Sequence, residues 1–324
     1  MQRREFMAIA GGATAAWPLV ALAQQPARKP RLGILLYSTP EEDAQAKALR
    51  EGLRELGYVD GQNISIEYRF AEGKPERLAD LAADLVRLKP DVLFPVGGDV
   101  APFVTKATQT IPIVFVMSAD PLQLGLVASV ARPGGNATGF TFLQDELASK
   151  RLELFKEVAP RISRVAFLSN PDHPDNELRV AQRAATTLGL RLQQIDMRGP
   201  DDLDGALRAV TQASIDALYV VASRQTVAAL PRIVNFATNS ELPLAGGWGA
   251  WAQAGGLLSY GPNVGEVVRS AANYVDKVFK GAKPGDLPVQ QPTRFELLIN
   301  LRSARALGLS ISESILLRAD KVIE

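Results

Sequence analysis

Polar side chains follow several apolar runs of this sequence, at the point where each run ends. They supply hydroxyls, carboxylates, an amide and a guanidinium, together with glycines that either let a ligand approach the backbone or form a turn. Such groups hold a small ligand through hydrogen bonds and charge. The candidate ligand-binding residues of this kind are Tyr37, Ser38, Gly98, Asp99, Ser118, Asp120, Asn170, Ser223 and Arg224, with Thr39, Gly97 and Ser169 beside them.

Aromatic side chains lie near the same turns. Phe140 and Phe142 end an extended run, Trp248 and Trp251 lie on either side of a glycine, and Tyr260 ends a later strand. Because a glycine-rich stretch packs poorly in a core, we expect at least one of the tryptophans to be exposed or to face a cleft. Trp248 and Tyr260 therefore join the candidate ligand-binding residues. Aromatic walls with a few oriented polar groups suit a small, partly apolar, charged ligand.

Several of these residues also have a structural interpretation. Asp99 precedes a short predicted helix and is its N-cap, a ligand contact, or both. Asp120 precedes a proline, which is typical of a turn. Arg224 either clamps a ligand or pairs with a surface carboxylate of its own lobe. Tyr37 and Tyr260 can equally be core aromatics.

The sequence lacks the patterns of common catalytic sites. Its single histidine, His173, lies in a loop, and we expect it to be solvated. Asp172 and Asp175 flank it, but the chain has no cysteine, so a second nitrogen or sulfur ligand for a metal is missing. The sequence contains no G-x-S-x-G elbow, no phosphate-binding P-loop and no G-x-G-x-x-G after its first apolar run. We therefore predict a binding protein without enzymatic activity, metal or cofactor.

Apolar runs and amphipathic segments alternate along the chain. Predicted strands and helices begin with strands at 31–37, 63–70, 91–96 and 113–116 and helices at 41–56, 75–88 and 100–108. After the extended run 137–142 the alternation starts again, with strands at 164–168, 190–195, 217–221 and 242–244. This rhythm predicts an α/β fold with right-handed crossovers on parallel sheets. Ligands of such folds bind at the carboxyl ends of the strands, where the polar residues above are found.

The chain is long enough for two lobes of roughly 150 residues each. Glycine and proline clusters at 133–136 and 246–249, and the stretch 287–292, interrupt the alternation. We interpret these breaks as three crossovers between two similar lobes. Lobe one is predicted to comprise 30–142 and 247–288, and lobe two 143–246 and 289–324.

Residues 1–23 have the features of an export signal of the twin-arginine type. Arg3 and Arg4 precede a short apolar run, which ends in the small-x-small cleavage site Ala21-Leu22-Ala23. The general secretory route and an uncleaved anchor helix are the alternatives. Because no cysteine is present to carry a lipid, we expect a cleaved protein that is free in the periplasm.

The charge balance gives no reason to expect a nucleic-acid or membrane-surface partner. The 324 residues carry a formal net charge of +1, and the export signal accounts for it with two arginines against Glu5. Basic residues are not interleaved with aromatics in any run. The sequence therefore predicts no nucleic-acid partner.

The stretch IPIVFVMSADPLQLGLVASVARPGGNATGFT, from Ile111 to Thr141, resembles a segment of the ABC transporter substrate-binding family that includes tryptophan-binding lipoproteins. Further matches are GLRELGYVDGQNISIEYRFAEG, LLSYGPN and FELLINLRSARALGLSI, so the resemblance covers nearly the whole chain after the leader. It implies the type I periplasmic-binding-protein fold: two Rossmann-like lobes joined by three crossovers, with the ligand in the cleft between them.

The resemblance also implies a function, the periplasmic solute-binding component of an ABC importer. Its ligand would be an amino acid, aromatic ones included, or a related small carboxylate. Its partners would be a membrane permease and a separate ATPase subunit, and the protein itself would be a monomer. A periplasmic receptor that feeds a sensor kinase is the alternative, and an α/β enzyme of unfamiliar type is a third reading. Relatives carry a small hydroxyl residue where this chain has Gly97-Gly98, so their choice of ligand does not transfer directly.

These readings combine into one expected binding mode. A ligand carboxylate would be held by Arg224 or by hydroxyls such as that of Ser118. The cationic or polar end would lie at Asp99, and the apolar part would pack on Trp248 or Tyr260.

Overall fold

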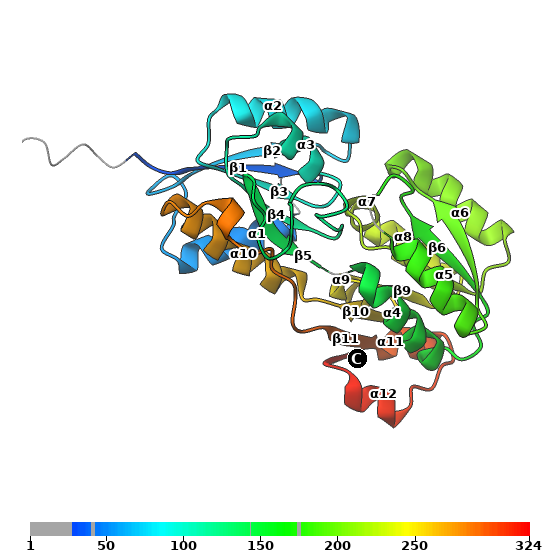
Figure 1. Ribbon diagram of the computed structural model, residues 1–324. Helices are drawn as coiled ribbons and strands as arrows, with labels where there is room; N and C mark the ends of the chain where they lie inside the picture. The colour runs from blue at the N-terminus through cyan, green and yellow to red at the C-terminus, as the bar shows by residue number, and fades with distance from the viewer. Residues whose placement is uncertain (1–27, 40–42, 143, 174–175) are drawn as a thin grey trace, which may run out of the picture.

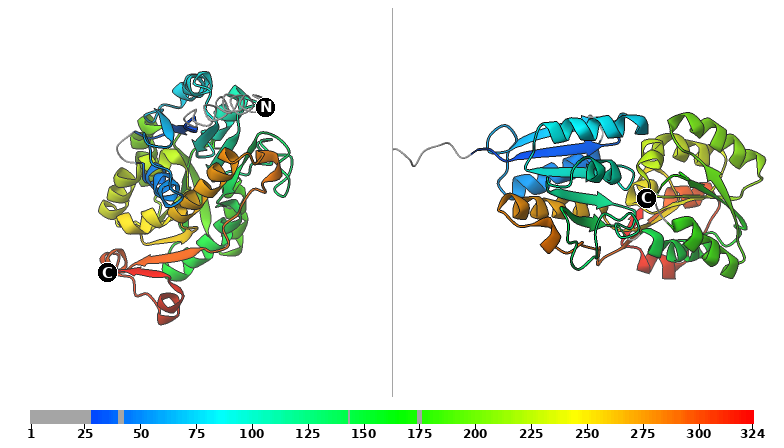
Figure 2. Two further views of the ribbon diagram at one scale, coloured as in Figure 1. Left: turned by 90° about the vertical axis from the view of Figure 1, so that its left-hand side faces the viewer. Right: turned by 45° about the horizontal axis from the view of Figure 1, so that its top comes forward.

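The computed structural model describes residues 28–39, 43–142, 144–173 and 176–324, which form two lobes lying side by side (Figures 1 and 2). Each lobe is built on a mainly parallel sheet with helices on its faces, so the α/β prediction is confirmed. The export signal predicted at 1–23 lies outside the described residues. Within the described ranges, no helix has the length and apolar character needed to cross a membrane.

In the described part of the chain, lobe one contains a five-stranded sheet in the order β2-β1-β3-β4-β5, with every neighbouring pair parallel. The strands are β1 (Arg31–Leu36), β2 (Ser65–Phe70), β3 (Val92–Val96), β4 (Ile113–Met117) and β5 (Ala137–Thr141). Helices α2 (Leu78–Arg87) and α3 (Ala101–Ala107) lie on one face, and α1 (Ala44–Glu55) and α10 (Val264–Phe279) lie on the other (Figure 1). Continuous apolar runs such as that of β4 fit a sheet covered on both faces.

Helix α1 is fixed at its N-terminus by Asp43 and against α10 by a glycine. Asp43 Oδ1 accepts the backbone N–H groups of Gln45 and Ala46 at 2.9 and 3.0 Å, the N-cap arrangement. A Cβ on Gly52 would lie 2.4 Å from the carbonyl oxygen of Arg269 in α10. The two helices therefore pack closely, and α10 belongs to lobe one although it comes late in the sequence.

Among the described residues, lobe two contains a seven-stranded sheet in the order β12-β11-β10-β9-β8-β6-β7, in which only the β10–β11 pair is antiparallel. The strands are β6 (Arg164–Ser169), β7 (Arg191–Asp196), β8 (Ala217–Val220), β9 (Leu244–Gly246), β10 (Leu258–Gly261), β11 (Glu296–Asn300) and β12 (Lys321–Ile323). The helices are α4 (Gln144–Val158), α5 (Glu177–Thr187), α6 (Leu203–Gln212), α7 (Arg224–Ala228), α8 (Leu230–Asn239), α9 (Gly249–Ala254), α11 (Leu301–Ala306) and α12 (Glu313–Arg318). A short 3₁₀ turn precedes α6 at Pro200–Asp202, and two more lie in lobe one at Pro75–Arg77 and Pro284–Asp286.

The second crossover lies later in the chain than predicted, so the lobe boundary at 247 is wrong. Strands β9 and β10 and the helix α9 between them belong to lobe two, where β10 pairs with both β9 and β11. The glycine cluster is a tight turn from β9 into α9, because a Cβ on Gly246 would lie 2.4 Å from the Trp251 ring. The chain returns to lobe one only after Gly261. It leaves again after Gln290, whose N–H still bonds the Gly139 carbonyl in β5 at 2.8 Å.

One apolar cluster contains buried residues of both lobes. It includes Leu36 of lobe one and Val220 of lobe two, both inaccessible to solvent. Phe142, just after β5, meets Trp248 of lobe two edge to face, with ring centroids 5.9 Å apart. The two lobes therefore share apolar contacts next to the first crossover, at Phe142.

Candidate ligand-binding cleft

The loops at the carboxyl ends of the lobe-one strands contact the corresponding loops of lobe two. The loop after β1 meets Arg224, which begins α7 a few residues after β8, and the loop after β4 meets the loop after β6. A pocket of about 640 Å³ lies between the lobes, a volume that suits a small-molecule ligand. It is lined by Ser38, Thr39, Asp43, Ala44, Gln45, Glu72 and Gly73 of lobe one, by Pro200, Arg224, Val227, Ala228, Leu230, Pro231, Trp248, Gly249, Ala250, Gln253, Gly261, Glu296 and Leu298 of lobe two, and by 262–265 at the crossover.

The first polar bridge across the cleft joins Arg224 of lobe two to Asp43 of lobe one. The Arg224 guanidinium bonds the Asp43 carboxylate through Nη2, and the two side chains are only 7% and 1% exposed. Ser38 Oγ donates to the same carboxylate oxygen at 2.5 Å and lies 3.3 Å from Arg224 Nη2. Burial alone would raise the pKa of Asp43, but Arg224, Ser38 and the backbone N–H groups of α1 outweigh it and hold the pKa below its usual value.

The two glycines after β3 are required by close packing. Gly97 has φ +116°, and a Cβ there would lie 2.7 Å from Arg224 Cγ. A Cβ on Gly98 would lie 2.9 Å from the Ala119 Cβ. The chain turns at Gly98, as the turn expectation has it, and the group that approaches Gly97 is the protein's own Arg224; approach of a ligand to these glycines stays a prediction.

The second polar bridge joins His173 of lobe two to Ser118 and Asp99 of lobe one. His173 Nε2 lies 3.1 Å from Ser118 Oγ and 3.7 Å from Asp99 Oδ1. The histidine is 6% exposed, so the expectation of a solvated loop histidine is wrong. Serine and carboxylate approach the same ring nitrogen, whereas a catalytic triad needs them on opposite nitrogens. Among the described residues, the arrangement is a contact between the two lobes.

Asp99 does not cap the helix that follows it. The N-cap of α3 is Val100, and that helix end receives no side-chain hydrogen bond within the described residues. The N-cap reading of Asp99 is therefore wrong. The side chain is 8% exposed and approaches His173 of the other lobe.

Two predicted site residues of lobe two shape the backbone around the cleft. Ser223 is the N-cap of α7 and forms a capping box with Thr226, whose N–H bonds Ser223 Oγ at 3.2 Å. This cap fixes the start of the helix that carries Arg224. Asn170 Oδ1 accepts the N–H of Asp172 at 3.0 Å and so stabilises the turn that leads to His173.

The remaining predicted residues have local partners. The Tyr37 hydroxyl donates to the Gly73 carbonyl at 2.7 Å, and burial, followed by the nearby Asp99 charge, raises its pKa. Asp120 accepts the backbone N–H two residues later at 2.8 Å, so the turn reading is confirmed. Tyr260 is half-buried, and its ring lies 6.3 Å from that of Phe295. Within the described residues, none of these three lines the pocket.

The tryptophan expectation is confirmed for Trp248, which lines the pocket, while Trp251 is fully buried in the core. Three buried polar atoms in this part of the protein find no hydrogen-bond partner in the described part of the chain: Arg224 Nε, Gln225 Oε1 and Trp248 Nε1. Buried polar groups are normally paired. Arg224 and Trp248 line the pocket and Gln225 is next to Arg224 in the chain, but all three atoms are shielded from solvent.

Sequence reasoning missed Asp43, Gln225 and two further acidic lining residues, Glu72 and Glu296. Asp43 carried a usable signal, because an aspartate that precedes an amphipathic helix is a favoured N-cap. The predicted helix began at 41 and placed Asp43 inside it. Glu72 and Glu296 carry no local signal, since only packing brings them to the pocket, and Gln225 is buried beside Arg224 in the chain.

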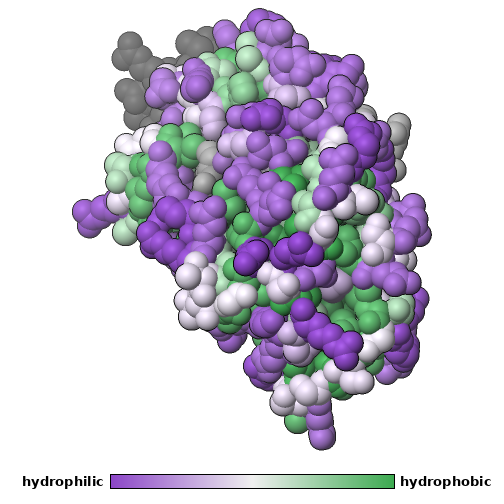
Figure 3. Space-filling view, turned by 90° about the vertical axis from the view of Figure 1, so that its right-hand side faces the viewer, coloured by the Kyte–Doolittle hydropathy of each residue, from purple (hydrophilic) through white to green (hydrophobic). Residues whose placement is uncertain are grey.

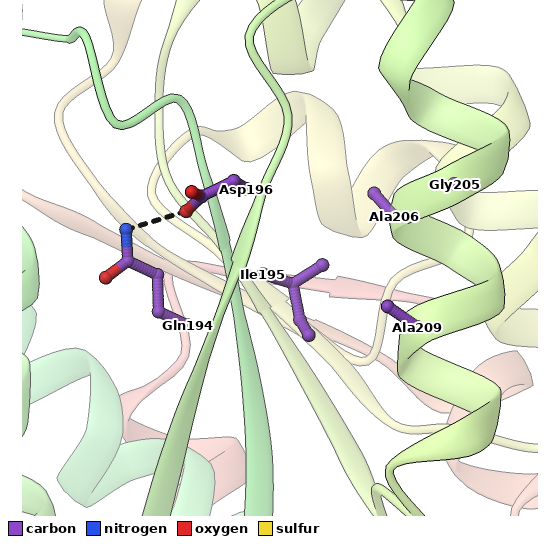
Figure 4. Close-up of a pocket in the computed structure, with 6 residues that line it drawn as sticks. All are labelled: Gln194, Ile195, Asp196, Gly205, Ala206 and Ala209. Carbon is purple, nitrogen blue, oxygen red and sulfur yellow. Dashed lines mark hydrogen bonds between the residues drawn. The ribbon is translucent and has the colours of Figure 1, made fainter.

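A second hollow lies away from the cleft, between the edge strand β7 and helix α6 of lobe two (Figure 4). It measures about 400 Å³ and is lined by Gln194, Ile195, Asp196 and three small residues of α6. The Gln194 amide donates to Asp196 Oδ1 at 2.8 Å (Figure 4). Polar side chains dominate the lobe-two side of the molecule, with apolar areas between them (Figure 3). The residues that line this hollow all belong to lobe two.

Comparisons with known proteins agree with this architecture. The family model "ABC transporter substrate binding protein" matches residues 34–323. The chain belongs to this family. Its fold is that of type I periplasmic binding proteins, and the protein is a solute-binding component of an ABC importer.

Individual relatives cover most of the chain. A tyrosine-binding protein of Clostridioides difficile strain R20291 is 25% identical over 277 residues, which are 85% of this chain and 79% of that protein. The structure of a conserved domain protein from Vibrio cholerae O1 biovar El Tor has a TM-score of 0.85 at 27% identity. A Streptococcus pneumoniae ABC domain in complex with L-Trp has a TM-score of 0.83 at 26% identity. Each of these two structures covers 91% of this chain over 100% of its own length.

Proposed function

We propose that this importer component captures a small organic ligand in the pocket between its lobes. The ligand is an amino acid, foremost an aromatic one, or a related carboxylate. The protein hands the ligand to a membrane permease that is driven by a separate ATPase subunit, and it does not change the ligand chemically. The observation that carries the proposal is the pocket of about 640 Å³, which both lobes line and which includes the buried Arg224–Asp43 bridge between the lobes.

The lining supports an amphipathic ligand. Trp248, Val227, Leu230 and Leu298 supply apolar surface, and Arg224 brings a guanidinium to the same pocket. The L-Trp complex and the tyrosine-binding relative point to the same class of ligand. Ser118 is a weaker choice for the carboxylate than Arg224, because its hydroxyl already contacts His173.

Closure supplies the transport signal in this proposal. The Arg224–Asp43 bridge exists only while the lobes are together, because its two residues belong to different lobes. A ligand that contacts both lobes binds the closed form better than the open form and shifts the population toward it. The permease then binds the closed form, which presents the surfaces of both lobes together.

The test is a thermal-shift screen against amino acids, aromatic acids, sugars and nucleosides, followed by calorimetry and small-angle scattering with each hit. We expect saturable stabilisation by an aromatic amino acid, a smaller radius of gyration with ligand, and recovery of the ligand unchanged. Stabilisation by sugars or nucleosides alone would refute the ligand class. An identical scattering profile with and without a tightly bound ligand would refute closure.

We further propose that residues 1–23 direct export to the periplasm by the twin-arginine route, and that the mature protein is a free monomer. Replacing Arg3 and Arg4 by lysine should leave the uncleaved precursor in the cytoplasm. Cell fractionation with an antibody against the mature chain measures this. Normal export of the double variant would favour the general secretory route.

A further inference from the structure

We propose that Gln45 of lobe one binds the ammonium group of the ligand through its side-chain oxygen, beside Arg224 of lobe two, which binds the carboxylate. The ligand is then an amino acid whose polar head joins the two lobes. This inference rests on the proposed function and deepens it, because it names the groups that recognise the ligand.

Gln45 occupies an apolar position of helix α1. The buried face of that helix consists of Gln45, Ala46, Ala48, Leu49, Gly52 and Leu53. Among these six residues Gln45 alone carries a polar side chain, and it is only 6% exposed. It lies four residues before Leu49, on the same stripe of the helix. A polar side chain on such a stripe is unfavourable unless it has a function.

The Gln45 amide is accessible from the pocket. Gln45 lines the pocket between the lobes. Its side-chain oxygen and nitrogen make no hydrogen bond within the described residues, yet neither is among the unpartnered atoms that are shielded from solvent. Both atoms are therefore accessible, and the space that this buried residue lines is the pocket. Because buried polar groups are normally paired, a bound ligand is the partner that we expect.

Asp43 lines the same pocket but has no acceptor site left for an ammonium group. Its Oδ1 accepts the backbone N–H groups of Gln45 and Ala46 at 2.9 and 3.0 Å. Its Oδ2 accepts the Ser38 hydroxyl and Arg224 Nη2. An ionised carboxylate has about four acceptor sites, and these four donors occupy them. The ammonium group therefore needs another acceptor, and the Gln45 amide oxygen is one.

The Asp43 carboxylate also holds Gln45 and Arg224 near each other. One carboxylate oxygen accepts the Gln45 backbone N–H, and the other bonds the Arg224 guanidinium. Both residues line the pocket, so they form one corner of it. The ammonium and carboxylate groups of an amino acid are attached to a single carbon atom. Their binding groups must therefore lie in one corner of this kind.

Arg224 keeps a donor for the ligand carboxylate. Its contacts with Asp43 and Ser38 both use Nη2. Arg224 Nη1 makes no hydrogen bond within the described part of the chain and is not among the unpartnered atoms that are shielded from solvent. A guanidinium N–H that remains accessible suits a carboxylate oxygen.

The two head-group contacts come from different lobes. Gln45 lies in the first turn of α1 in lobe one, and Arg224 begins α7 in lobe two. A ligand with both polar groups contacts both lobes and so stabilises the closed form, whereas a ligand with one polar group makes only one of these contacts. The apolar lining, which includes Trp248 and Leu298, remains for the ligand side chain.

The experiment measures the affinities of three probes of one shape by calorimetry. L-Tryptophan carries both polar groups, 3-indolepropionate lacks the ammonium group, and tryptamine lacks the carboxylate. Gln45→Met keeps the length of the side chain and removes its hydrogen-bonding atoms, and Gln45→Glu keeps an acceptor oxygen. Gln182→Met is the matched control, because Gln182 is exposed on α5 of lobe two, outside the described pocket lining. Circular dichroism checks the fold of each variant.

We expect Gln45→Met to weaken L-tryptophan and tryptamine by at least about tenfold, because the ammonium group of each loses a charge-assisted hydrogen bond. The same variant should bind 3-indolepropionate as the parent does. Gln45→Glu should keep or raise the affinity for tryptamine, since the acceptor remains and gains a charge. Gln182→Met should bind all three probes as the parent does.

The outcomes separate this inference from the proposed function. If L-tryptophan binds the parent protein and Gln45→Met equally well, the Gln45 assignment is wrong and the proposed function stands. Equal weakening of L-tryptophan and 3-indolepropionate would also overturn the ammonium assignment. If Gln45→Met does not fold, Gln45→Glu decides, and a loss of its tryptamine affinity would overturn the assignment. If none of the three probes and no other amino acid binds the parent protein, the proposed function is wrong as well.

Discussion

Two buried arginine–carboxylate pairs have the same chemistry but different positions. Arg151 and Glu177 pair inside lobe two, and both side chains have no solvent exposure. The Tyr219 hydroxyl donates to Glu177 at 2.6 Å, and Arg151 Nε donates to the Tyr260 carbonyl at 2.9 Å. Burial is the main cause that raises the pKa of Tyr219 well above its usual value, so its hydroxyl keeps its proton.

The Arg224–Asp43 pair joins the two lobes across the cleft. Its partners are 181 residues apart in the chain and meet only when the lobes close. In an open form, water can solvate both charges. The comparison therefore separates two uses of one interaction: Arg151–Glu177 supports the folded state, whereas Arg224–Asp43 supports the closed state. Four experiments test that difference.

The largest effect is expected for Glu177→Gln. It removes the negative charge beside the buried Arg151 guanidinium, and loss of one partner of a buried pair destabilises by roughly 3–5 kcal/mol. Urea denaturation should show this loss in the ligand-free protein. Asp204→Asn is the control, because Asp204 pairs with Arg232 at the surface, where the side chains are 64% and 56% exposed. Equal stability of the two variants would contradict a structural role for the buried pair.

Asp43→Asn should weaken ligand binding and leave the stability of the ligand-free protein nearly unchanged. Asparagine still caps α1, so the helix end is retained. Loss of a charged hydrogen bond costs about 1.5–3 kcal/mol, or roughly a 10- to 150-fold rise in Kd. Calorimetry measures the affinity, and small-angle scattering should show incomplete closure. A large loss of stability without a change in Kd would show that Arg224–Asp43, like Arg151–Glu177, supports the folded state and not closure.

Low pH should weaken the Arg224–Asp43 bridge by protonating Asp43. The closed form holds the pKa of Asp43 below its usual value of 3.8. The bridge therefore contributes fully above that value and is lost as the pH falls through the lowered pKa. Binding titrations from neutral pH downward should show a steeper acid loss of affinity in the parent than in Asp43→Asn. Parallel curves would mean that other carboxylates control the acid limit.

Gly97→Ala should weaken ligand binding by disturbing Arg224, but by less than Asp43→Asn does. Alanine at φ +116° is strained, and its Cβ would lie 2.7 Å from Arg224 Cγ. A shift of the arginine and a backbone strain of about 1–2 kcal/mol should raise Kd about 5- to 30-fold. Gly135→Ala is the control, since a Cβ there has no atom within 4 Å. Parent-like binding by Gly97→Ala would show that Arg224 does not need this glycine.

Much of the local structure followed from the sequence. The apolar run of β4 and the amphipathic segment of α2 form as predicted. Any α/β sheet offers adjacent strands and covering helices that bury such segments, so their structure does not depend on one particular partner. The turn at Asp120 also formed as predicted, because its hydrogen bond spans two residues. The family could be identified from motifs alone, and the match over 34–323 agrees.

The glycine cluster at 246–249 shows where local reasoning fails. A run of glycines signals a break in regular structure, but it does not say whether the break is a turn or a crossover between lobes. Packing of Trp251 against Gly246 makes it a turn, and the pairing of β10 with β9 keeps the chain in lobe two. That choice depends on contacts, which the local pattern does not contain.

The sequence by itself determined the alternation of strands and helices, and with it the loops that had to carry the polar residues. Only the tertiary structure decided what those residues meet. His173 meets Ser118 from 55 residues away, and Arg224 meets Asp43 from 181 residues away. The physical reason is range: a helix, a strand or a turn is fixed by interactions within a few residues, whereas a bridge between lobes exists only once both lobes have folded and closed.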